Sequence, residues 1–85
     1  MRIAAVGERE SIIGIRLAGV KTVLETSNPK EALEYVKKLL EENDIAIIII
    51  TSAIIEQIQS ELETLRRGRM TPAFITFPDV NIAKR

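Results

Sequence analysis

The sequence predicts an α/β fold: a small open parallel sheet of four strands, in the order 2-1-3-4, with helices on both faces. The first observation is the run at residues 44–51, DIAIIIIT, which has five isoleucines in six consecutive positions. A strand with one wet face would alternate apolar and polar residues, so this strand is expected to be covered on both faces. The second observation is that strand-like and helix-like segments alternate along the chain, as they do in parallel sheets with helical crossovers. The two most apolar strands, the first and the third, then belong at the centre.

Composition restricts the classes of function that are open to the chain. Its 85 residues predict one domain over residues 1–78, followed by a short tail at residues 79–85. The formal net charge is zero, which removes the general electrostatic case for binding nucleic acid or an anionic membrane surface. The chain has no cysteine and no histidine, so it lacks disulfides, thiolate zinc ligands and the commonest general base. The first residues begin a strand pattern and not a signal peptide, so we expect a cytoplasmic protein.

The first half of the predicted domain contains a strand at residues 2–6, ended by Gly7, and a helix at residues 8–18. Gly19 suits the left-handed position just past the end of that helix. Gly14 interrupts the helix at a cost of about 1 kcal/mol relative to alanine. Close packing against the sheet is the simpler account of Gly14, and close approach of another chain is the alternative.

A second strand is predicted at residues 20–25, and its polar residues suit a sheet edge. The next helix runs from Pro29 to about Glu42. Asn28 is placed to be its N-cap, Pro29 fits the first helical position, and Glu31 stands where the acid of a capping box would.

The second half of the chain continues the alternation. The apolar run at residues 44–51 is the third strand, and Thr51 or Ser52 is expected to cap a helix that reaches about Arg67. Gly68 then breaks the helix, and residues 73–77 predict the fourth strand.

Catalytic chemistry is not indicated at the carboxyl ends of the strands, where sites of open α/β sheets lie. Neither the G-x-G-x-x-G nor the G-x-x-x-x-G-K-[ST] phosphate loop is present. Serine hydrolysis is implausible because no histidine can activate a serine. We therefore interpret the chain as an interaction module and not an enzyme.

The topology is flavodoxin-like or receiver-like, but a response-regulator receiver needs a pair of acids after the first strand and a phosphoacceptor aspartate at the end of the third. This chain has Glu8 at the first place and Thr51 at the second, so phosphoryl transfer would have no nucleophile. Glu8 could hold a cation with Thr51 or Asp79, although favouring the positive end of a helix is the simpler account of Glu8.

Several segments together resemble the F subunit of the archaeal and vacuolar-type (A-type and V-type) rotary ATP synthases. They are IAAVG at residues 3–7, GIRLAGV at 14–20, NPKEAL at 28–33, the run at 44–51, Arg66-Arg67 and the strand before Pro78. Two features depart from the family pattern. Members often have Phe where Ile15 stands, and they usually continue past the last strand into a C-terminal helical segment that is missing here.

This resemblance implies a non-catalytic subunit of the central rotor stalk, which helps couple or regulate ATP synthesis and hydrolysis with ion transport. Its expected partners are the coiled-coil D subunit of the rotor and, in the assembled complex, the catalytic A/B hexamer. It implies no cofactor, no metal, no nucleic acid and no direct insertion into the membrane, only a position peripheral to it. The alternative is a receiver-like signalling module that binds a small ligand or phosphate at the strand ends.

The surface that docks the partner is only hinted at by the sequence. We expect it among the first helix, the edge strand at residues 73–77 and the basic corner that follows the third helix. The candidate interface residues are Gly14, Arg16, Arg66, Arg67, Arg69 and Phe77.

Overall fold

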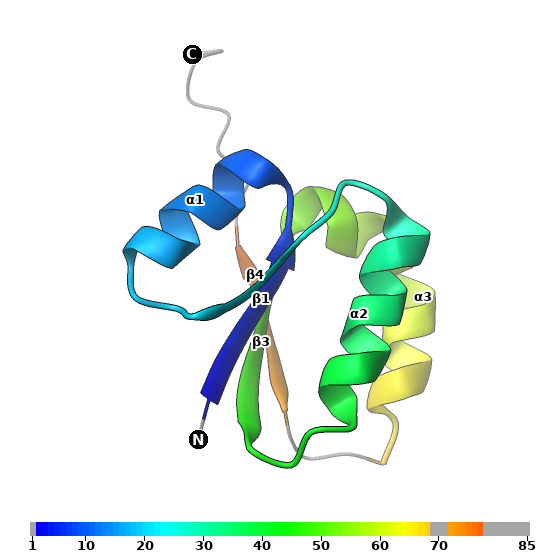
Figure 1. Ribbon diagram of the computed structural model, residues 1–85. Coiled ribbons are helices and arrows are strands. Elements are labelled where there is room, and N and C mark those ends of the chain that lie inside the picture. Colours follow the sequence, from blue (N-terminus) through cyan, green and yellow to red (C-terminus); the bar gives the residue numbers. More distant parts are fainter. Residues whose placement is uncertain (1, 69–71, 78–85) are drawn as a thin grey trace.

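The computed structural model describes residues 2–68 and 72–77 and confirms the predicted fold class (Figure 1). The sheet is parallel throughout, with strand order β2-β1-β3-β4. Arg69, Pro78 and the predicted tail at residues 79–85 lie outside the described residues. The elements are β1 Arg2–Gly7, α1 Arg9–Leu17, β2 Thr22–Glu25, α2 Pro29–Leu40, β3 Ile45–Thr51, α3 Ser52–Arg66 and β4 Ala73–Phe77.

The turn between α1 and β2 is longer than predicted. The helix ends at Leu17 and strand pairing starts at Thr22, because the intervening residues bond back to the helix. The Gly19 N–H donates to the Arg16 carbonyl, and the Val20 N–H donates to the Ile15 carbonyl. Gly19 has a φ of 108°, the left-handed conformation expected of it.

The two faces of the sheet carry cores of unequal size. α2 and α3 lie on one face and α1 lies alone on the other (Figure 1). The smaller core, under α1, consists of the buried residues Ala5, Ile12 and Ile15. The larger core, under α2 and α3, joins buried residues of β1 and β3 to both helices: Ala4, Val6, Ala32, Val36, Leu39, Ile45, Ile48, Ile50, Ile54, Ile58 and Leu62.

The amino end of α2 is capped as predicted, with one addition. The Asn28 side chain accepts hydrogen bonds from the N–H groups of Lys30 and Glu31, at 2.8 and 3.3 Å. Glu31 does not bond back to the Asn28 N–H, as it would in a capping box. That N–H donates to the Thr26 hydroxyl at 3.0 Å, and the hydroxyl donates to the Glu31 carboxylate at 2.6 Å. Thr26 therefore relays the bond that a capping box would make directly through Glu31.

The amino end of α3 corrects a second capping prediction. Thr51 is the N-cap residue, but its side chain makes no capping hydrogen bond. Its hydroxyl donates instead to the Glu8 carboxylate at 2.5 Å. The side chain is fully buried against the end of β1.

Gly7 is the residue that allows this approach of β1 and β3. A Cβ at Gly7 would lie 2.3 Å from Cγ2 of Thr51, which is a severe overlap. Since Gly7 does not take a positive φ, space and not backbone conformation requires the glycine. A Cβ at Gly14, in contrast, would meet no atom within 4 Å.

Two glycine-to-alanine variants should therefore have opposite effects. Gly7→Ala overpacks the end of the central strands and should lower the free energy of unfolding by about 1–3 kcal/mol. Gly14→Ala, in open space on a helix, should raise it by about 0.5–1 kcal/mol. Urea unfolding followed by circular dichroism measures both. Equal effects of the two variants would contradict this account.

An ion-pair network joins the amino ends of the two central strands, and the sequence did not reveal it. The Arg2 guanidinium donates two hydrogen bonds to Asp44, at 2.7 and 3.0 Å, and also bonds Glu42. A fourth bond, at 3.2 Å, reaches the Thr22 hydroxyl at the start of β2. The hydrogen bonds from Arg2 hold the pKa of Asp44 below its usual value of 3.8.

The Arg2–Asp44 pair should contribute stability that depends on pH. Because the pKa of Asp44 is lower in the folded protein than in the unfolded one, the contribution is complete above the unfolded pKa and is lost as pH falls through the folded pKa. Asp44→Asn should therefore lower the free energy of unfolding at pH 7, and its deficit relative to wild type should shrink below about pH 4. Urea titrations at several pH values measure this. A deficit that stays constant with pH would refute it.

Candidate partner-docking site

A single helix cannot cover the whole of the sheet face on which α1 lies. Among residues 2–68 and 72–77, the large hydrophobic side chains that remain exposed are Ile3 (41%), Ile13 (50%), Leu17 (83%) and Ile75 (48%). Ile13 and Leu17 belong to α1 itself. We call these four residues the α1 surface. Exposed apolar side chains gathered on one side of a protein are typical of a binding surface.

Strand register places Ile3 and Ile75 on the same sheet face as α1. Ile75 pairs with Ile49, which packs against the small core of Ala5, Ile12 and Ile15. Ile3 precedes the buried Ala5 by two positions, so it points to the same face. Both isoleucines are therefore half-covered continuations of that core.

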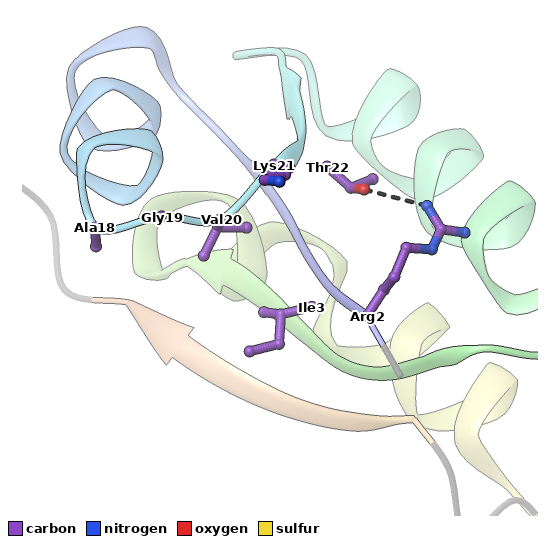
Figure 2. A pocket seen from close by; sticks show the side chains of 7 residues that line it. All are labelled: Arg2, Ile3, Ala18, Gly19, Val20, Lys21 and Thr22. Atoms are coloured by element: carbon purple, nitrogen blue, oxygen red, sulfur yellow. Dashed lines mark hydrogen bonds between the residues drawn. The ribbon is translucent and has the colours of Figure 1, made fainter.

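A hollow of about 340 Å³ lies at the amino end of β1, beside the turn that follows α1. Figure 2 shows Ala18, Gly19 and Val20 of this turn on one side and Ile3 of β1 on the other. The exposed Lys21 also lines it. The hollow thus combines an apolar floor with two cations, Arg2 and Lys21, which suits an apolar side chain of a partner next to an acidic group.

The predicted interface residues fall on two different faces. Gly14 and Arg16 are exposed on α1, and Phe77 is half-buried against the small core beneath it. Arg66 lies on the other face, with its guanidinium carbon 5.5 Å from the centre of the Phe74 ring. Arg67 is exposed beyond the end of α3.

The environment of Gly14 overturns the packing account of this residue. It is exposed, and a Cβ there would touch no neighbour, so close packing against the sheet is wrong. The sequence also missed Ile3 and Ile75 as surface residues. Their strands are mainly apolar, and only the single-helix cover of that face shows that they remain exposed.

The carboxyl ends of the strands offer little to a phosphate. A polar hollow of about 470 Å³ there is lined by Thr26, Ser27 and Arg9 together with four acids, Glu8, Glu10, Glu25 and Glu31. Four carboxylates disfavour an anion electrostatically. Thr51, at the position of a receiver's phosphoacceptor, is buried and donates its hydroxyl to Glu8. Within the described part of the chain, no cluster of three or more acids, histidines or cysteines could hold a metal ion.

Helices long and apolar enough to cross a membrane are not found among the residues that the structure describes.

Comparison with known proteins identifies the family. Residues 3–84 match the model of the family described as ATP synthase (F/14-kDa) subunit. The chain is 40% identical to the F subunit of the A-type ATP synthase of Methanocaldococcus jannaschii over 67 residues, which cover 79% of this chain and 68% of the relative. It is 30% identical to the corresponding protein of Methanocorpusculum labreanum over 76 residues, 89% of this chain and 76% of the relative.

A solved structure has the same fold. The crystal structure of the F subunit of the V-type ATP synthase of Archaeoglobus fulgidus superimposes with a TM-score of 0.76 at 22% identity, covering 89% of this chain and 95% of that one. The resemblance drawn from the sequence is thus confirmed, and the chain belongs to the family of ATP synthase (F/14-kDa) subunits, to which it is joined by its similarity to A-type F subunits.

Proposed function

We propose that this chain is a non-catalytic subunit of the central stalk, and that it docks on the coiled-coil D subunit through the α1 surface. In the assembled complex it would rotate within the catalytic A/B hexamer, outside the membrane, and help couple ATP synthesis or hydrolysis to ion transport. Family membership supports the complex to which the chain contributes. The single observation that carries the choice of docking surface is the exposed apolar set Ile3, Ile13, Leu17 and Ile75.

The chemistry of the α1 surface fits a helical partner. Leu17 and Ile13 are four residues apart, so they form one apolar ridge on the outside of α1. The exposed cations Arg16 and Lys21 lie within four residues of Leu17 in the chain. A helix of a coiled coil presents apolar residues flanked by charged ones, and acidic flanks would pair with these cations.

The alternative, a receiver-like module that binds a small ligand or phosphate at the strand ends, is disfavoured by the same geometry. The strand-end hollow is acidic, and the Thr51 hydroxyl at the end of β3 is committed to Glu8. The hollow beside Ile3 is lined mainly by apolar residues, with the cations Arg2 and Lys21 and the hydroxyl of Thr22 at its edge. The exposed apolar residues therefore fit the binding of a protein partner better than the binding of a small ligand or phosphate.

Leu17→Glu tests the docking surface. Leu17 is 83% exposed, so the substitution should leave the fold intact while placing a charge within the proposed apolar contact. We expect the affinity for the D subunit, taken from the same source and measured by isothermal titration calorimetry, to fall about tenfold or more, as for loss of an interface hot spot. Ser60→Glu, which adds the same charge on exposed α3, is the matched control and should bind as wild type does.

Arg67→Glu separates this proposal from docking at the basic corner. Arg67 is exposed at the end of α3, remote from α1 in the fold. Loss of affinity in Arg67→Glu with normal binding by Leu17→Glu would move the docking site to the corner. If the folded wild-type chain shows no binding to the D subunit, the proposed partner itself is wrong.

A further inference from the structure

β4 is an edge strand that carries no protective charge or proline within its own five residues. Among the described residues it pairs with β3 on one side only, because it is the last strand in the sheet order. Exposed edges are normally blunted by charged residues, proline or shortness. The opposite edge, β2, follows this rule: it has four residues, ends in Glu25 and is preceded by Lys21. β4 has five residues, AFITF, with no charge; Pro72 and Pro78 flank the strand in the sequence, so all five of its residues keep their backbone N–H groups.

We propose that two copies of this chain pair through their β4 edges, antiparallel and centred on Ile75, to form a continuous eight-stranded sheet. The proposal concerns the free chain and does not rest on the docking of the D subunit. A second copy is the expected partner of the open edge, because the side chains of β4 match those of its own copy in this register.

The side chains of β4 match in size across the proposed two-fold axis. Antiparallel pairing centred on Ile75 places this residue opposite its own copy, Ala73 opposite Phe77, and Phe74 opposite Thr76. Each bulky phenylalanine thus faces a smaller residue. The exposed half of the Ile75 side chain would contact its copy on the sheet face that α1 leaves uncovered. Pairs of β-branched side chains directly opposite each other stabilise antiparallel strands.

The two ends of α3 carry charges of opposite sign, with the exposed acids Glu61 and Glu63 between them. α3 connects β3 to β4 along the chain. At its carboxyl-terminal end lie Arg66, over the Phe74 ring, and the exposed Arg67. The exposed Glu56 lies near the opposite end of the helix. A two-fold axis at Ile75 turns the two α3 helices antiparallel, so the basic end of each lies toward the end of the other that carries Glu56. The zero net charge of the chain leaves no general repulsion between copies.

The interface is small, so the dimer should be weak. Two five-residue strands and their flanking helix ends fall below the roughly 1,200 Å² of buried surface that typical stable complexes reach. Self-association should therefore depend on concentration, and a covalent trap is the most sensitive way to detect it.

Ile75→Cys provides that trap, since the natural chain contains no cysteine. Directly opposite residues of antiparallel strands have Cα atoms about 4.5–5.5 Å apart, a separation that a disulfide spans. Under a mild oxidant such as oxidised glutathione, purified Ile75→Cys should form a disulfide-linked dimer at least about tenfold faster than control variants do, as seen by non-reducing electrophoresis.

Two control variants define the register. Thr76→Cys is exposed on the same strand, but in this register it lies opposite Phe74 of the other copy and should link poorly. Ile13→Cys is as exposed as Ile75→Cys but lies on α1. Equal linking by all three variants, or preferential linking by Thr76→Cys or Ile13→Cys, would overturn the proposal.

A charge exchange at Ile75 provides an independent measurement. Ile75→Lys and Ile75→Glu each place like charges opposite each other and should weaken self-association about tenfold or more in sedimentation equilibrium. A mixture of the two variants should recover it, because the opposite charges then face each other. A wild-type chain that stays monomeric at millimolar concentration, or a mixture no more associated than its components, would refute β4 self-pairing.

Discussion

The rest of this structure depends on one constraint: the three crossovers of a four-stranded parallel sheet supply only three helices to cover two faces. Joining four parallel strands in the order β2-β1-β3-β4 with right-handed crossovers places α1 on one face of the sheet and both α2 and α3 on the other. α2 and α3 together bury the sheet face on which they lie, and the shorter α1 leaves part of the other face exposed. The apolar strands require cover on both faces, so the uncovered part of the α1 side becomes a surface that favours a partner.

The ends of the two central strands explain why such a surface, and not a strand-end pocket, is the candidate for function. At the carboxyl end, Gly7 lets β1 approach the Thr51 side chain, whose hydroxyl is then directed to Glu8. At the amino end, Arg2 joins β1 to the chain that enters β3 through Asp44. A catalytic protein with this topology, such as a response-regulator receiver, would expose a reactive group at the position where Thr51 is buried. Here the same contact that packs the strands also closes that position.

Local sequence patterns predicted the elements well because their causes are local. The isoleucine run predicts a central strand with helices on both faces, and Asn28 before Pro29 predicts a helix start. Both are confirmed, although Ile47 and Ile49 are only partly buried. The side chains whose contacts were misassigned or missed depend on partners far along the chain. Thr51 bonds Glu8, 43 positions away, and Arg2 bonds Asp44, 42 positions away. For the same reason the sequence could not separate Arg16 from Arg66, since only the side on which each helix packs shows that they lie on opposite faces.

The α1 surface and the β4 edge use different kinds of recognition. The first offers side chains on a helix and a sheet face, and the second offers backbone groups whose specificity comes from the order of small and large residues along one strand. Ile75 belongs to both, because its side chain lies on the α1 face while its backbone lies in the outermost strand. A partner that covers the Ile75 side chain removes apolar contact from the β4 pair, so partner binding and self-pairing compete at this residue. Variants with changes at Ile13 or Leu17 leave the β4 edge intact, and the two modes of association can therefore be separated.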